Sequence, residues 1–291
     1  MTTTLSTTAR PSRSQLRWTR LTTVRRRSST VDLVAVGAFV LLVLVAVAAP
    51  LLAPHSPVLT SGEAFLPPGS PGHLLGTDGL GYDIASRLLY GLRSSLGAAA
   101  LVIASGVVVG GIVGAIAGAQ AGWVDTVLMR TTDLFLSLPG LVIAMAVAAA
   151  LGASFRSALI GIAVVWWPLY ARLVRGEVRA LASRPHLEAA RLAGVGWTGR
   201  LVRHLLPGTR STIVVAASLD VGGLVVALSA LSFIGLSSPA PAPELGAMAA
   251  QGMAYLLQSW WVPIFPGLAV MLIAFVANLA GDGVRDLMRE H

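Results

Sequence analysis

The chain has 291 residues, of which 55% are hydrophobic and 12% are charged. Soluble domains carry about 25% charged residues, so this composition excludes an ordinary soluble protein and indicates an integral membrane protein. The net charge is +8, but the arginines gather at the ends and in the connections of apolar segments, which argues against a nucleic-acid-binding surface. No cysteine is present, which excludes disulfides, thiolate metal sites and cysteine nucleophiles.

Residues 1–30 are rich in serine, threonine and arginine and lack apolar periodicity, so we expect a disordered, basic cytoplasmic tail near anionic lipid headgroups. Residues 31–53 form a continuous apolar run that predicts the first transmembrane helix. A signal peptide is the alternative, since the run ends in AVAAP. The apolar core is longer than that of a signal peptide and the preceding tail is too long, which favours an uncleaved helix with its N-terminus inside.

Residues 54–93 are polar and rich in proline and glycine, and they predict an outer loop. Asp78 is placed to cap the helix that follows, and Asp83 and Arg87 have the i, i+4 spacing of a helical ion pair. Thr77 and Asp78 near His73 would also suit a metal or hydrolytic site. Three such residues in one loop are weak evidence, and the five histidines of the chain show no metal-ligand spacing.

The second predicted span, residues 96–119, carries glycine at every fourth position, which leaves a bare face where another helix can approach closely. That partner belongs either to this chain or to a neighbouring subunit. The glycines of this stripe are Gly106, Gly110, Gly114, Gly118 and Gly122.

The third predicted span is residues 127–151, with a kink at Pro139 and an ion pair between Arg130 and Asp133. The fourth is residues 158–174, where Trp166 and its neighbour Trp167 fall in the middle of the span. Tryptophans usually mark membrane interfaces. This pair is therefore expected to pack within the bundle or to line a path.

Residues 175–210 are too polar to span a membrane, and their arginines outnumber those of every outer loop, which predicts a cytoplasmic position. The segment is expected to form two short helices. Glu188 suits the first helix near its N-terminus, and Gly194 ends that helix. Thr198 is placed to cap the second helix, and Pro207 is expected to end it.

The fifth predicted span, residues 212–236, contains Asp220. An intramembrane carboxylate is costly and faces either protein or a water-filled path, so a path role and a packing role both stay open. The sixth span is residues 263–280, preceded by Trp260 and Trp261, which suit an outer aromatic belt.

Glu188-Ala189-Ala190, followed by Gly194 and by Leu206-Pro207, resembles the EAA loop of ABC-importer permeases. His204 stands where the general pattern has isoleucine, and the resulting HxLP form resembles the peptide and nickel branch of that family. In that family the loop contains a coupling helix, which docks in a groove on a separate ATPase subunit.

Three further segments resemble the second (C-type) permease of dipeptide, oligopeptide and nickel ABC importers. HLLGTDGLGYDIASRLLYGLRSSL resembles the family's GTDxxGRDxxSRxxYGxRxSL signature, with Tyr82 in place of the usual arginine. ALSFIGL resembles EASLSFLGL, with Leu228 in place of glutamate, and it is followed by a Pro-x-Pro-Glu-x-Gly-x-Met core. GDGVRD resembles GDGLRD, so the resemblance extends from about His73 to Asp286.

The resemblance implies an all-α membrane protein with about six transmembrane helices, both termini cytoplasmic, and the type I ABC-importer permease fold. Residues 94–287 would be a core of five helices with a cytoplasmic coupling loop at 175–210. The partners would be a sister permease in a heterodimer, two cytoplasmic ATPase subunits and an extracytoplasmic substrate-binding protein, all at a bacterial inner membrane.

The sequence contains no GxxxxGK[ST], HExxH or GxSxG, so we expect a non-catalytic subunit without a cofactor or metal of its own, and ATP bound by the partners. Di- or oligopeptides are the expected cargo, with nickel chelates as the alternative. Two alternative hypotheses are an ion-coupled transporter that uses Asp220 and a membrane-bound scaffold without transport. Asp220 and Trp166 are the candidates for the translocation path, and the residues expected to couple to the ATPase are Glu188, Ala189, Ala190, Arg191, Gly194, Leu206 and Pro207.

Overall fold

The computed structural model describes residues 28–120, 122–185, 190, 192–236 and 242–289. The described residues form helices, turns and two isolated β-bridges, and they contain no extended strand. Five of the described helices are long and apolar enough to cross a membrane, and a bent helix pair gives a sixth crossing if it counts as one span. This confirms the expected all-α fold of about six spans. The five are α2 (Ser28–Val47), α4 (Ile84–Ala119), α7 (Phe155–Ala182), α11 (Arg210–Phe233) and α13 (Trp261–Arg289).

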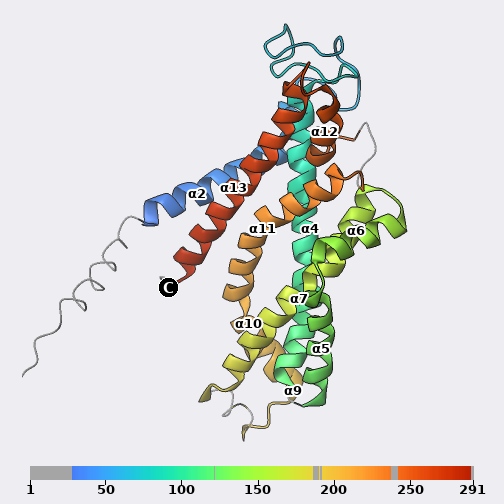
Figure 1. The fold of residues 1–291 in the computed structure, drawn as a ribbon. Helices are drawn as coiled ribbons and strands as arrows, with labels where there is room; N and C mark the ends of the chain where they lie inside the picture. The colour runs from blue at the N-terminus through green and yellow to red at the C-terminus, as the bar shows by residue number, and fades with distance from the viewer. Residues whose placement is uncertain (1–27, 121, 186–189, 191, 237–241, 290–291) are drawn as a thin grey trace, which may run out of the picture.

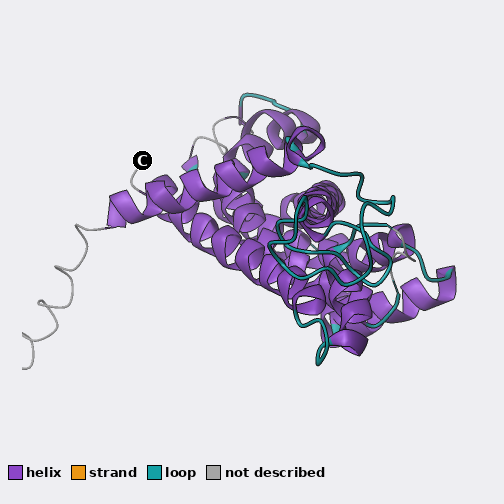
Figure 2. Ribbon diagram, turned by 90° about the horizontal axis from the view of Figure 1, so that it is seen from above, coloured by secondary structure: helices purple, strands orange, loops and turns teal. Residues whose placement is uncertain are grey.

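Shorter elements lie at the two ends of the bundle and, for α5 and α6, along its side (Figure 1). We call one end the cap end, because the irregular segment 53–83, here named the cap, lies there beside α12. The opposite end is the loop end, which holds the described residues of the connection 183–209. Seen from above, the loops of the cap lie across the helix ends (Figure 2). The shorter elements are α3 (Ala49–Leu52), α5 (Trp123–Ser137), α6 (Gly140–Leu151), α9 (Trp197–Arg200), η2 (Leu201–Leu205), α10 (Leu206–Gly208), α12 (Leu245–Gly252) and η3 (Met253–Tyr255).

The glycine stripe of α4 packs against α7 of the same chain, which decides between the two partners that the sequence allowed. A Cβ atom at Gly110 would collide with the carbonyl oxygen of Trp167, and one at Gly114 with that of Ala171. At Gly118 it would lie 2.9 Å from the carbonyl oxygen of Arg175. The two backbones therefore touch over several turns. Gly122 does not take part, because it lies in the turn before α5 with φ of +98°.

The third predicted span is not a single helix. Residues 123–137 and 140–151 form α5 and α6, which meet at an angle of 87°. The break lies at Leu138 and Pro139, both of which have extended backbone conformations. Proline disfavours a helical conformation in the residue before it. The predicted kink is therefore in the right place, but the chain bends there by nearly a right angle. α6 then packs on α7, where Gly161 lies against the carbonyl of Ala144.

The structure differs from the sequence interpretation at several positions of the cap end. α4 begins at Ile84, within the segment 54–93 that was expected to be loop. Asp83, rather than Asp78, is its N-cap and accepts the N–H of Ser86. Asp78 instead lies 3.8 Å from Arg87 through a carboxylate oxygen, and Asp83 does not pair with that arginine.

Other differences concern the loop end and the last connection. Asp133 pairs with Arg172 of α7 at 2.7 Å, rather than with Arg130 on its own helix. α7 continues to Ala182, into the segment expected to be loop. The connection before α13 contains α12 and η3, and Trp261 is buried there with its indole N–H donating to the carbonyl of Thr77 at 3.3 Å.

α2 lies along α13, with the backbone of Asp32 about 3 Å from a Cβ built at Gly283. Since α2 begins where α13 ends, the first and last described helical turns lie close together (Figure 1). This arrangement agrees with both termini on one side of the membrane.

The α4–α7 contact predicts a position-specific effect of one added methyl group. Gly110→Ala should reduce the free energy of unfolding by about 1–3 kcal/mol, because the methyl forces two touching backbones apart. Gly111→Ala is the matched control, because a Cβ there meets nothing within 4 Å. Alanine has the higher helix propensity, so this control should unfold at the wild-type temperature or slightly above it. The measurement is thermal unfolding of the purified protein in detergent, followed by circular dichroism, and equal midpoints for the two variants would contradict the close contact.

Candidate coupling and translocation site

The first half of the loop-end connection closes with a glycine-terminated helical turn. Ala190 is helical, and its carbonyl accepts the N–H of Val195 at 3.0 Å. Gly194 between them has φ of +80°. This bond and the left-handed glycine form a Schellman motif, the helix end that the sequence predicts at Gly194. Of the other candidate coupling residues, Glu188, Ala189 and Arg191 lie outside the described residues.

The second half is a continuous helical run of α9, η2 and α10. Thr198 lies within α9, so it is not the N-cap that was expected. Pro207 does not end the helix either: the helical run continues through it to Gly208, and the chain turns at Thr209. Leu206 precedes this proline and is partly buried. The π-helical turn η2 places Leu205 inward.

Leu205 anchors the connection to α7. It is buried in one apolar cluster with Val174, Val178 and Leu181, and Leu206 packs against that cluster. A Cβ at Gly208 would lie 2.5 Å from a methyl of Leu181, so α10 also contacts this part of α7. The re-entry from the connection into α11 is thus fixed by apolar packing on the final turns of α7.

An ionic cluster joins α5 to the same part of α7. Asp125 accepts hydrogen bonds from Arg175, one of them at 2.8 Å, and from Arg179. Its side chain is 9% exposed, whereas Asp133 and Arg172 form a second pair that is about half exposed. A buried carboxylate with two arginines holds its geometry better than an exposed pair. We call α5, the last three turns of α7, η2 and α10 the loop-end block.

The two candidates for the translocation path are in direct contact. The indole N–H of Trp166 on α7 donates to a carboxylate oxygen of Asp220 on α11 at 3.0 Å, and both side chains are half-buried. Tyr170, one turn further along α7, is fully buried, and its hydroxyl has no hydrogen-bond partner among the described residues. The carboxylate therefore links α7 to α11 within the bundle.

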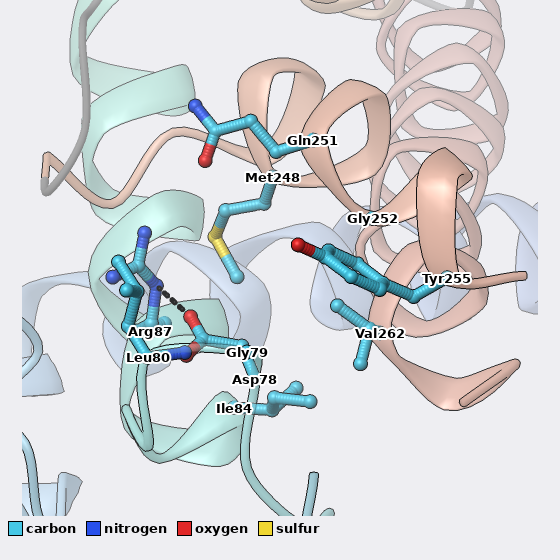
Figure 3. Close-up of a pocket in the computed structure, with 10 residues that line it drawn as sticks. All are labelled: Asp78, Gly79, Leu80, Ile84, Arg87, Met248, Gln251, Gly252, Tyr255 and Val262. Atoms are coloured by element: carbon cyan, nitrogen blue, oxygen red, sulfur yellow. Dashed lines mark hydrogen bonds and ion pairs between the residues drawn. The ribbon is translucent and has the colours of Figure 1, made fainter. Parts of the chain in front are cut away.

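A pocket of about 360 Å³ lies at the cap end, and the sequence analysis did not identify it. Figure 3 shows Arg87 and Asp78 on one side of it and Met248, Gln251 and Tyr255 on the other. Arg87 also donates to the carbonyl of Pro57 at 3.3 Å. The pocket joins residues more than 150 positions apart, a proximity that no local pattern shows. Its full lining is Asp78, Gly79, Leu80, Ile84, Arg87, Met248, Gln251, Gly252, Tyr255 and Val262.

Glu244 positions the α12 wall of this pocket. Its buried carboxylate caps α12 by accepting the N–H groups of Gly246 at 3.1 Å and Ala247 at 2.7 Å. Burial raises the pKa of the Glu244 carboxyl, and these hydrogen bonds offset part of that effect. Gly246 is required because a Cβ there would collide with the carbonyl of Ser229 on α11. The Pro-Glu-x-Gly-x-Met core is thus a capped helix start held against α11.

Removing the Asp125 carboxylate should loosen the loop-end block. Asp125→Ala is expected to lower the free energy of unfolding by about 1–2 kcal/mol, because two arginines lose charge-assisted hydrogen bonds. Asp133→Ala is the matched control on the same helix; its exposed pair should contribute less than about 1 kcal/mol. Denaturant unfolding of the two purified variants in detergent measures the difference. A loss at Asp133 equal to or larger than the loss at Asp125 would contradict this account of the block.

Solved structures share the architecture described above. The chain superimposes on the inward-facing structure of the MetNI methionine ABC transporter with a TM-score of 0.58 and 18% sequence identity, over 71% of this chain and 97% of that chain. At this identity the likeness concerns the fold, which is that of a type I importer permease.

Curated relatives extend over most of the chain. The protein named "Probable D,D-dipeptide transport system permease protein DdpC" of Escherichia coli K12 is 39% identical over 86% of this chain and 84% of its own length. The glutathione transport system permease protein GsiD of Escherichia coli O6:K15:H31 is 41% identical over 74% and 71%. The dipeptide transport system permease protein DppC of Alkalihalophilus pseudofirmus is 35% identical over 91% and 86%.

The family model described as "Binding-protein-dependent transport system inner membrane component" matches residues 106–290, which include the loop-end connection and four of the five long helices in whole or part. The chain therefore belongs to the binding-protein-dependent transport system inner membrane components, and it is a multi-pass ABC-transporter permease of the bacterial inner membrane.

Proposed function

We propose that this permease imports di- and oligopeptides as one of two membrane subunits of an ATP-driven transporter. The relatives named for dipeptide, D,D-dipeptide and glutathione transport support a peptide cargo over a nickel chelate. The partners would be a sister permease, two cytoplasmic ATPase subunits that bind and hydrolyse ATP, and an extracytoplasmic binding protein that meets the cap end. Residues 1–30 would form a cytoplasmic tail.

The proposed mechanism rests on one observation: the second half of the loop-end connection packs against the last turns of α7 through Leu205. In the proposed mechanism, a helix around Glu188–Gly194 docks on an ATPase subunit, where Ala189 and Ala190 allow a close fit. Glu188 and Arg191 would supply polar contacts at its edges. The Gly194 turn fixes the direction of the chain after this helix, and Leu206 and Pro207 set its re-entry into α11.

Movement of the docked helix would reach the membrane through specific contacts. Leu205 transmits it to the last turns of α7 by apolar packing, and Asp125 ties α5 to the same turns. α7 is in backbone contact with α4 at Gly110 and Gly114, so these helices would move together rather than separately. ATP-driven closure of the ATPase pair would then rock the bundle between states that open to one side of the membrane or the other.

Asp220 would act where α7 meets α11. Because Trp166 already donates to its carboxylate, the pair can hold the two helices together in one state and can offer a polar contact to a peptide backbone in the other. An ion-coupled transporter would predict more intramembrane carboxylates and internal inverted repeats. In the described part of α11 a single acidic residue is present, and it is hydrogen-bonded to a neutral donor.

Uptake by the reconstituted complex tests the cargo. The complete importer in proteoliposomes, supplied with its binding protein, should accumulate radiolabelled di- and oligopeptides when ATP is inside, and it should not accumulate chelated nickel. Without ATP, uptake should fall to the level of empty liposomes, because an ion gradient does not drive this transporter. A Walker A lysine variant of the ATPase partner is the matched control.

Two outcomes would contradict the proposal. Nickel uptake without peptide uptake would assign the chain to the metal branch of its family. Peptide uptake that is driven by a proton or sodium gradient without ATP, and that is abolished by Asp220→Asn, would establish the ion-coupled mechanism instead.

A further inference from the structure

Three potential metal ligands converge in the cap. They are His55, His73 and Asp83, and their ligand atoms lie within 4.8 Å of one another. His73 Nδ1 is 2.9 Å from one carboxylate oxygen of Asp83, and His55 Nδ1 is 3.9 Å from the other. The two imidazole rings stack with centroids 4.8 Å apart. Two histidines separated by 18 positions thus meet at the N-cap of α4.

The burial of this cluster is unusual for groups of its polarity. Asp83 is fully buried and His73 is 5% exposed. His55 Nδ1 is also buried and has no hydrogen-bond partner within the described part of the chain. A buried polar atom without a partner costs about 1–3 kcal/mol, so such an atom calls for an explanation. A cation between His55 Nδ1, His73 Nδ1 and Asp83 would satisfy it and would neutralise the buried carboxylate.

The surrounding backbone holds all three side chains in place without the ion. The backbone N–H of His55 donates to the hydroxyl of Ser86 at 3.0 Å, and the backbone N–H of Ser86 donates to Asp83 at 2.8 Å. Gly62 lies against the far nitrogen of His73, since a Cβ there would be 2.6 Å from Nε2. The Nδ1 atom of His73 is consequently directed to Asp83. The ligands are fixed on three segments before any metal arrives.

We propose that His55, His73 and Asp83 bind a divalent transition-metal ion with the ligand preferences of zinc. Two imidazole nitrogens and one carboxylate are typical zinc ligands, and three protein ligands leave one position for water. Mg²⁺ and Ca²⁺ prefer all-oxygen sites, so they suit this set poorly. His55 is 30% exposed through its side chain, which gives the ion a route in.

The bound ion would join His55, near the start of the cap, and His73 to Asp83, the N-cap residue of α4. It would thereby fix the neighbouring pocket wall formed by Asp78 and Arg87. The site is far along the chain from the coupling connection and from Asp220, and it does not depend on which solute the importer carries.

Zinc binding to the purified full-length chain in detergent tests the proposal. After treatment with EDTA and its removal, titration calorimetry with ZnCl₂ should show saturable binding of one ion per chain, and MgCl₂ should give no comparable signal. His55→Phe keeps an aromatic ring that can stack on His73 but removes one metal ligand. Zinc affinity should therefore fall by at least about tenfold. At the same zinc concentration, the unfolding temperature of the wild type should rise more than that of His55→Phe.

His204→Gln is the matched control, because this exposed histidine lies in η2 at the other end of the molecule. It should bind zinc as the wild type does. His55→Gln provides a second test if the phenylalanine variant is poorly folded, and it should show the same loss. Absence of one-to-one zinc binding by the wild type, or equal affinity of the wild type and a folded His55 variant, would overturn the proposal.

Discussion

The backbone contact between α4 and α7 is the constraint on which the rest of the structure depends. Gly110 and Gly114 let the carbonyl groups of α7 approach α4 at a distance that no side chain would permit. In a membrane, close packing and interhelical polar contacts drive helix association, because lipid is as apolar as the helices themselves. With this pair fixed, α6 covers one face of α7, α5 is tied to its last turns by Asp125, and α11 meets it at the Trp166–Asp220 hydrogen bond.

The two ends of the bundle are stabilised by different kinds of contact. At the loop end, apolar packing at Leu205 and the hydrogen bonds of Asp125 join α5, the last turns of α7, η2 and α10 into one block. At the cap end, an irregular chain is held by turns, buried polar groups and the capped starts of α4 and α12. The polar groups at this end are thus held in position by contacts within the chain.

The sequence predicted those features that local chemistry determines. The four-residue spacing of glycines predicted a close helix contact, and the glycine at 194 predicted a helix end, because both follow from backbone sterics. Pairings across the fold were missed. Asp83 was expected to pair with Arg87 by helical spacing, yet it caps the helix and contacts His73, since the cap folds back over α4. The convergence of His55 with His73 likewise arises from the fold of a loop without periodicity. Pro207 was expected to end a helix, but the helical run continues through it to Gly208.

Cross-linking from the coupling connection tests the central claim most directly, namely that the residues around Gly194 transmit the action of an ATPase subunit. The chain has no native cysteine, so Ala190→Cys introduces a single thiol, and Ser61→Cys in the cap is the matched control. In the assembled importer, a short bifunctional reagent should join Cys at position 190 to an ATPase subunit, with a yield that changes when ATP is bound, and it should not join Cys at position 61. Failure of the position-190 variant to cross-link to any ATPase subunit, in a complex shown to be assembled and active, would contradict the account.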